Sequence, residues 1–238
     1  MAASQAGALL VDLREELFSL DHHPSLTGDI GDRQAHVFLL DLLAREAPSD
    51  AVLSEEGRDD LARLAAQRVW IIDPVDGTRE FSERGRTDWA VHVALTIDGV
   101  AVAGAVALPA RGITLTTDPP PAPRAPYDGE PRILVSRSRP PSQARLIQES
   151  LGGQLVPMGS AGAKAMAVVL GEADVYAHSG GQYEWDNAAP AAVAQAAGLH
   201  VSRLDGSPLR YNQPDPWLPD LLICRPDLAD GVLRALHG

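Results

Sequence analysis

The sequence has little of several features that mark other classes of protein. A single cysteine, Cys224, excludes an internal disulfide and favours a reducing, cytoplasmic compartment. Aromatic residues make up only 5% of the 238 residues. No apolar run reaches the ~18 uncharged residues that indicate a membrane span, and the N-terminal segment lacks the basic region that begins a signal peptide. We therefore expect a cytoplasmic protein that does not interact with membranes.

Basic residues are also few. The chain has 20 Lys and Arg against 32 Asp and Glu, a net charge of −12. A protein that binds a nucleic-acid polymer normally presents a basic stripe to the phosphates, and no such stripe is visible. The acidic surplus can form a solvated, self-repelling surface, or some carboxylates can bind hard cations. Net charge does not distinguish these alternatives, but local spacing does.

The chain changes character at a proline-rich segment, DPPPAPRAPYDGEP, over residues 118–131. Such a sequence cannot form a helix or an interior strand, so we expect a surface connection there. The expected organisation is an N-terminal α+β lobe over 1–118, the connection over 119–131, and a C-terminal α/β lobe over 132–238. Helical and strand patterns alternate along the chain, which predicts a layered α/β fold.

Apolar periodicity gives the approximate positions of these elements. We expect helices over residues 6–18, 33–46, 142–151, 161–170, 186–197 and 228–236, and strands over 51–53, 69–72, 89–97, 100–108, 132–136, 174–177 and 221–224. Asp98-Gly99 joins two of the strands and is typical of a tight hairpin. The segment with His22, His23, Pro24 and Gly28 is expected to be a loop.

The strongest chemical signal is the segment Asp73-Pro74-Val75-Asp76-Gly77-Thr78. It follows a buried strand pattern, so two carboxylates emerge where sites are commonly built in α/β sheets. Gly77 permits a sharp turn, and a helix that begins at Thr78 would offer free N–H groups to a phosphate. The alternative is an ordinary Asp-Pro turn with a local cap.

Two further segments reduce the weight of that alternative. Ser54-Glu55-Glu56-Gly57 follows another predicted strand, and Glu184–Ala189 places Asp186 at the start of an alanine-rich helix. Taken alone, these would be an exposed loop and an N-cap. Together the three segments supply oxygen ligands from distant parts of the chain. Such ligands can assemble a site for two or three Mg²⁺ ions around a phosphate.

In order and spacing, the three segments resemble the signature of the inositol monophosphatase superfamily, the lithium-sensitive, Mg²⁺-dependent phosphomonoesterases. The resemblance runs from about Asp32 to about the C-terminus. Within the superfamily the chain is similar to the CysQ branch, and to its actinobacterial form in YEWDNAAP and SRLDGSPLRYNQ. The segments that carry the CysQ resemblance are Val52–Glu56, Asp76–Phe81, Val135–Ser138, and Gly159-Ser160 followed by Lys164.

The resemblance implies a sugar-phosphatase fold of alternating helix and sheet layers, with the site between two lobes. It implies hydrolysis of the 3′-phosphate of adenosine 3′,5′-bisphosphate (PAP), or of its sulfated form PAPS, in sulfate assimilation. It also implies the metal ligands. Glu55, Asp73 and the Val75 carbonyl match those of a first Mg²⁺, and Asp73, Asp76 and Asp186 match those of a second.

The resemblance further implies roles around the substrate. Thr78 matches the residue that orients the attacking water, helped by Asp32, and Glu55 belongs with these two in the catalytic set. The N–H groups of Gly77 and Thr78 would hold the scissile phosphate. The second phosphate of PAP would be held by Arg137, Ser160 and Lys164.

Several alternatives stay open at this point. The same chemistry could serve inositol monophosphate or fructose 1,6-bisphosphate, and the chain could be a monomer or a homodimer. A non-catalytic metal-binding module would need neither Thr78 nor a phosphate-binding helix end, so it is disfavoured. Because the sequence has no nucleophile motif, the expected reaction is direct attack by metal-activated water on a small phosphate monoester.

Overall fold

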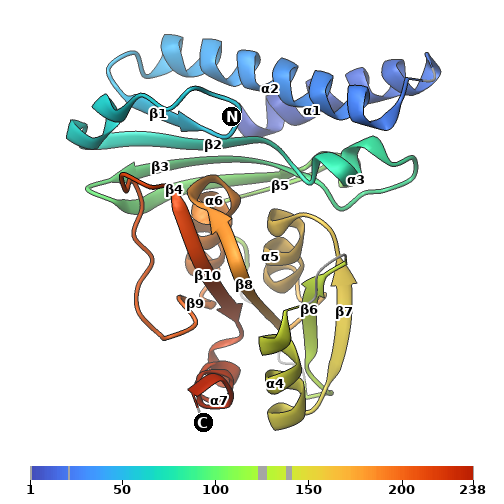
Figure 1. Cartoon of the computed structure of the whole chain (residues 1–238), viewed down its shortest axis with the longest axis vertical. Coiled ribbons are helices and arrows are strands. Elements are labelled where there is room, and N and C mark those ends of the chain that lie inside the picture. The colour runs from blue at the N-terminus through green and yellow to red at the C-terminus, as the bar shows by residue number, and fades with distance from the viewer. Residues whose placement is uncertain (1, 21, 123–127, 138–140, 238) are drawn as a thin grey trace.

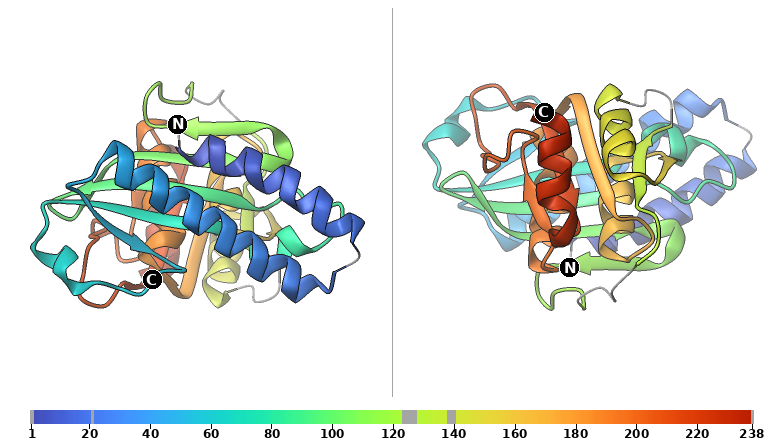
Figure 2. Two further views of the ribbon diagram at one scale, coloured as in Figure 1. Left: turned by 90° about the horizontal axis from the view of Figure 1, so that it is seen from above. Right: turned by 90° about the horizontal axis from the view of Figure 1, so that it is seen from below.

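The computed structural model describes residues 2–20, 22–122, 128–137 and 141–237, which form alternating layers of helix and sheet (Figure 1). Helices α1 (Ala2–Ser19) and α2 (Pro24–Glu46) lie side by side over the first sheet, as Figure 2 shows from above. Helices α5 (Ala161–Val169) and α6 (Glu184–Ala196) lie between the two sheets. Helices α4 (Ser142–Leu151) and α7 (Pro226–His237) pack together on the second sheet. The alternation expected from the sequence is present.

The first sheet has the strand order β1-β2-β3-β4-β5. Strand β1 runs parallel to β2, and the other neighbouring pairs are antiparallel. The turn between β3 and β4 places Asp98 and Gly99 at φ angles of 50° and 74°, the left-handed pair that a two-residue hairpin requires. The strands are β1 (Ala51–Ser54), β2 (Arg68–Asp76), β3 (Ala90–Ile97), β4 (Val100–Leu108) and β5 (Ile113–Thr116).

The second sheet has the order β7-β6-β8-β10-β9. Strand β6 runs parallel to both neighbours, whereas β10 is antiparallel to β8 and β9. The strands are β6 (Arg132–Ser136), β7 (Gln154–Met158), β8 (Val175–Tyr183), β9 (His200–Ser202) and β10 (Trp217–Cys224). The short 3₁₀ helices η1 (Leu61–Ala65) and η2 (Pro109–Arg111) belong to connections.

The main hydrophobic core joins the two sheets through the middle helices. It contains Leu53 and Val69 from the first sheet, Val193 from α6, and Leu221 from the second sheet. Alanines dominate the middle helices, and their small side chains let a helix approach a strand closely. A Cβ atom on Gly104 of β4 would lie 3.0 Å from the Ala189 carbonyl oxygen of α6. The division of the chain into two lobes stays a prediction.

The prediction of a loop before residue 33 is wrong, because α2 already begins at Pro24. Proline suits the first turn of a helix, and the His23 ring accepts a hydrogen bond from the Ser25 N–H. Gly28, which suggested a loop, and Gly31 serve close packing instead. A Cβ atom on Gly28 would lie 2.7 Å from the Thr78 methyl, and one on Gly31 would lie 2.5 Å from the Phe81 ring. These contacts bring α2 against the short helix that follows β2.

Other differences concern short or peripheral elements. Strands β5, β7 and β9 were not expected from the sequence, because strands of three to five residues carry little periodicity. The described parts of the proline-rich connection, residues 118–122 and 128–131, contain no helix or strand, and residues 123–127 lie outside the described residues. Within the described chain, every helix is too short or too polar to cross a bilayer.

Candidate active site

The end of β2 forms the centre of the candidate site. Ile71 and Ile72 are buried, and the strand continues through Asp73 to Asp76, with a register shift against β3 between the two aspartates. Gly77 then adopts a φ of 87°, and helix α3 (Thr78–Ser82) begins directly after it. An L side chain rarely adopts that angle, so glycine lets the strand turn sharply into the helix.

Three aspartates from distant segments meet at this turn. Carboxylate oxygens of Asp73, Asp76 and Asp186 all lie within 4.8 Å of one another. Asp186 comes from the first turn of α6, where its Oδ2 accepts a hydrogen bond of 2.6 Å from the Tyr183 N–H. Glu55 follows β1 and lies outside this group of three, although its carboxylate interacts with those of Asp73 and Asp186. The structure therefore brings together the acidic residues expected to bind metal.

Burial and mutual repulsion raise the pKa values of three of these carboxylates, those of Asp73, Asp186 and Glu55. Burial, followed by the charge of Glu55, raises the pKa of Asp73 well above its usual range. Burial and the charge of Asp76 raise the pKa of Asp186 to about 6. Burial and the charge of Asp186 raise the pKa of Glu55 to about 7. Such a cluster is unfavourable unless positive charge compensates it.

An unsatisfied atom shows that a cation fits this cluster. Asp73 Oδ1 is buried and has no hydrogen-bond partner among the residues that the structure describes. A buried carboxylate oxygen without a partner costs free energy, which a bound metal ion would recover. All the ligands are oxygens, the donor type that hard divalent cations prefer. The cluster can therefore hold a metal of the Mg²⁺ type.

Asp76 has a different environment from its neighbours. Its carboxylate accepts hydrogen bonds from the Ala161 and Gly162 N–H groups at 3.0 and 2.6 Å, and from the Ser160 hydroxyl. Its Oδ2 lies 3.2 Å from His92 Nε2. Burial alone would raise the pKa of Asp76, but His92 and the Ser160 hydroxyl outweigh burial and lower it to about 2. Asp76 is thus ionised and held at the N-terminus of α5.

Sequence reasoning missed His92. It is fully buried on β3, and its Nδ1 lies 3.0 Å from the Trp185 carbonyl oxygen, next to Asp186. The imidazole thereby connects β3 with the starts of α5 and α6. A Cβ atom on Gly162 would lie 2.0 Å from His92 Nε2, so glycine leaves room for the ring. A single imidazole within the apolar run 89–97 was the available signal.

Thr78 and Asp32 meet beside the carboxylate cluster. The Thr78 hydroxyl lies 3.3 Å from Asp32 Oδ1 and 3.1 Å from the Val75 carbonyl oxygen. Burial, followed by the charges of Glu56 and Glu55, raises the pKa of Asp32 to about 8. The hydroxyl therefore lies between a carboxyl group that exchanges protons near neutral pH and the turn that carries Gly77.

The three residues expected at a second phosphate have protein partners. Ser160 is next to Asp76, to which it donates a hydrogen bond. Lys164 is only 5% exposed, and its Nζ lies 3.2 Å from the Gly159 carbonyl oxygen and near those of Met158 and Ser160. Arg137 forms ion pairs of 2.7 Å with Glu80 and 2.9 Å with Glu83. Their assignment to a phosphate stays a prediction.

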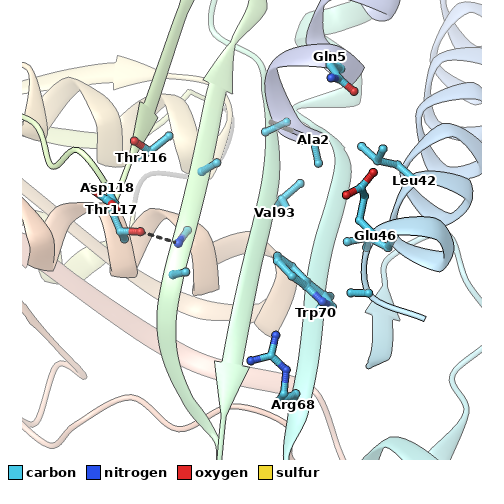
Figure 3. Close-up of a pocket in the computed structure, with 16 residues that line it drawn as sticks. Ala2, Gln5, Leu42, Glu46, Arg68, Trp70, Val93, Thr116, Thr117 and Asp118 are labelled. Carbon is cyan, nitrogen blue, oxygen red and sulfur yellow. Dashed lines mark hydrogen bonds between the residues drawn. The ribbon is translucent and has the colours of Figure 1, made fainter. Parts of the chain in front are cut away.

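A separate cavity of about 610 Å³ lies near the N-terminus (Figure 3). Trp70 and Val93 of the first sheet face Leu42 across it, and Arg68 and Glu46 lie at its border. None of the clustered aspartates lines this cavity. The chemistry expected from the sequence is therefore located elsewhere, at the end of β2.

Comparison with known proteins gives consistent matches. Residues 14–237 match the inositol monophosphatase family. The chain is 55% identical to a 3′-phosphoadenosine 5′-phosphate phosphatase of Mycobacterium leprae, over 98% of this chain and 90% of that protein. It is 31% identical to the 3′(2′),5′-bisphosphate nucleotidase CysQ of Escherichia coli, over 83% of each. A crystal structure of CysQ from Bacteroides thetaiotaomicron superposes with a TM-score of 0.78 at 29% identity, over 94% of each chain.

Proposed function

Because the chain belongs to the inositol monophosphatase family, we propose that it is a Mg²⁺-dependent phosphatase that removes the 3′-phosphate of PAP. The observation that carries the proposal is the convergence of the Asp73, Asp76 and Asp186 carboxylates, together with the buried Asp73 Oδ1, which has no hydrogen-bond partner among the described residues. The 55% identity to a protein named for this activity supports the choice of substrate. The proposal includes a small-molecule substrate and the cytoplasmic location expected from the sequence.

The acidic residues would hold the metal. Glu55, Asp73 and the Val75 carbonyl form one set of ligands, and Asp73, Asp76 and Asp186 form the other. Two or three bound Mg²⁺ ions would neutralise phosphate oxygens and lower the pKa of a coordinated water. The chain's contribution is to fix these oxygens at the ends of β1 and β2 and at the start of α6, so that little reorganisation is needed when the ions bind.

Thr78 and Asp32 would orient the attacking water. A hydroxyl that donates a hydrogen bond to Asp32 can accept one from the attacking water. The lone pair of the water oxygen then points toward phosphorus. In its ionised form Asp32 can take up a proton through this hydroxyl, and a pKa raised to about 8 lets it keep that proton near neutral pH. The free N–H groups of Gly77 and Thr78 would hold the scissile phosphate, because they begin a helix.

The second phosphate of PAP would be held beside the start of α5. Ser160 and Lys164 belong to the start of α5. Arg137 follows β6 and pairs with Glu80, whose side chain lies against Gly159 of the loop before α5. Arg137 is 28% exposed at its side chain and can exchange a glutamate for a phosphate. Lys164 lies directly beneath the loop carbonyls, where its charge favours an anion at the loop surface.

Phosphate release from a panel of monoesters tests the proposal. The panel contains PAP, PAPS, inositol 1-phosphate and fructose 1,6-bisphosphate at fixed Mg²⁺, with and without chelator. We expect the highest kcat/KM for PAP, loss of activity with chelator, recovery with Mg²⁺, and inhibition by Li⁺. Asp73→Asn should abolish turnover, whereas Asp41→Asn, an exposed change on α2, serves as the matched control.

Two outcomes would contradict the proposal. A higher kcat/KM for inositol 1-phosphate than for PAP would assign the protein to the alternative substrate. Turnover that persists in chelator, or in Asp73→Asn, would remove the carboxylate cluster from the reaction.

A further inference from the structure

Two aromatic side chains flank Asp186 at the start of α6. The rings of Tyr183 and Trp185 stack with their centroids 4.7 Å apart and their planes within 9° of parallel. The backbone N–H of Tyr183 donates to Asp186 Oδ2. A stacked pair is therefore connected directly to a carboxylate of the candidate metal site.

A third aromatic residue lies on the neighbouring strand. Trp217 at the start of β10 is the cross-strand partner of Tyr183 at the end of β8, and residues directly opposite in an antiparallel pair project to the same face. In Figure 1 the end of β8 and the start of β10 lie together below the first sheet. We refer to Tyr183, Trp185 and Trp217 as the aromatic platform.

A glycine makes room for the platform. Gly181 has a φ of 89°, and a Cβ atom there would lie 2.4 Å from Trp217 Nε1. The indole of Trp217 therefore lies directly against the backbone of Gly181. This contact leaves no space for a side chain at position 181. The position of the Trp217 ring is therefore determined by the local backbone rather than by core packing.

The platform is unusual in being exposed. Tyr183 is 45% and Trp217 is 49% exposed, and they are the only aromatic residues in the described part of the chain that are this open to solvent. The sequence has only 5% aromatic residues, yet these two are paired across β8 and β10, and Tyr183 is three residues before Asp186. Exposed aromatic residues that are neighbours are typical of a surface that binds a ligand or a partner.

We propose that the aromatic platform stacks the purine base of the substrate. The inference rests on the proposed function, which places a nucleotide's 3′-phosphate at Asp186. The base is attached to the same ribose as that phosphate, so it must lie near Asp186. Flat aromatic faces bind bases through stacking, without hydrogen-bond readout. Inositol phosphates have no flat ring, so the platform favours nucleotides over the alternative substrates and acts as a specificity determinant.

Equilibrium binding of adenosine 5′-monophosphate, the expected product, tests the platform without requiring turnover. Calorimetric titration of Tyr183→Leu and Trp217→Leu should each give a Kd roughly five- to twentyfold weaker than wild type. Tyr183→Phe keeps the ring and should bind as wild type does. Leu146→Ala removes an exposed side chain from α4 and serves as the matched control. Thermal melts establish that each variant is folded.

A kinetic comparison separates stacking from damage to the site. The abasic analogue of PAP carries both phosphates on the sugar without a base. The loss of kcat/KM in Tyr183→Leu should be five- to twentyfold larger for PAP than for this analogue. Equal losses for the two substrates would overturn the inference, because Tyr183 would then act only through the backbone that holds Asp186.

The outcomes also distinguish this inference from the proposed function. Wild-type protein that hydrolyses PAP, with unchanged nucleotide binding in both Leu variants, refutes the platform and leaves the function intact. Unchanged binding together with an altered oligomeric state in the Leu variants would identify the rings as a contact between copies of the chain, and would equally refute the inference. Failure of the wild type to hydrolyse PAP refutes the function itself. Weaker nucleotide binding in the variants would in that case still support the platform.

Discussion

The metal-free protein should lose stability as the pH rises, because Asp186 must ionise beside Asp76. Burial and the charge of Asp76 raise the pKa of Asp186 from its ordinary 3.8 to about 6. In the interval between those values the folded state binds more protons than the unfolded state. The stabilisation is therefore fully present below the ordinary value and is lost as the pH rises through about 6.

The difference between the two pKa values gives the size of the effect. It corresponds to about 3 kcal/mol, which partial solvent access reduces to about 1–2 kcal/mol. Asp186→Asn removes the charge but keeps a carbonyl oxygen for the Tyr183 N–H. In chelator at pH 8 we therefore expect this variant to melt about 2–8 °C above wild type. The difference in melting temperature should shrink as the pH is lowered to 5.5, because Asp186 of the wild type then becomes protonated. This pH is still above the pI of about 4.9.

Thermal melts followed by circular dichroism, with chelator and with excess Mg²⁺, provide the assay. Mg²⁺ at 100 times its Kd should stabilise the wild type by about 2.7 kcal/mol. Asp186→Asn should gain less because it has lost a ligand, and the control Asp41→Asn should gain as much as wild type. If Asp186→Asn were less stable than wild type at both pH values, or kept the full Mg²⁺ response, the reasoning from charge repulsion would be refuted.

Three further predictions concern other parts of the structure. Thr78→Val should lower kcat by about 10²-fold with little change in KM, because the water loses its orienting hydroxyl; Thr78→Ser should retain most activity, and equal losses in both variants would indicate damage to the fold. Lys164→Met should lower kcat/KM roughly 10- to 150-fold for PAP but not for inositol 1-phosphate; an equal loss for both substrates would limit Lys164 to supporting the loop carbonyls beside it. Arg63 is buried and donates hydrogen bonds to Asp59 and Asn212, so Arg63→Met should lower the free energy of unfolding by about 2–3 kcal/mol. Urea unfolding should show a lower midpoint at an unchanged slope; an unchanged midpoint would show that these contacts contribute no net stability.

Local sequence determined the parts of the protein that depend on short-range geometry. The apolar run before Asp73 predicts the strand, and Gly77 predicts the turn that follows it. Asp98-Gly99 predicts the hairpin, and Ser160 predicts the start of α5, where its hydroxyl accepts a hydrogen bond from the Ala163 N–H. Each of these features depends on backbone angles or hydrogen bonds within a few residues, so neighbouring residues are sufficient to specify it.

Tertiary packing decided the remaining features, because they depend on segments distant in the chain. Gly28 suggests a loop when read alone, yet it and Gly31 are helical because α2 must approach Thr78 and Phe81 closely. Asp76 and Asp186 look equivalent in sequence, but the start of α5 and His92 lower the pKa of the first, whereas burial beside a like charge raises that of the second. A carboxylate's residue type gives only its ordinary pKa. Its pKa in the folded protein depends on which charges and N–H groups the rest of the chain brings within a few ångströms of it.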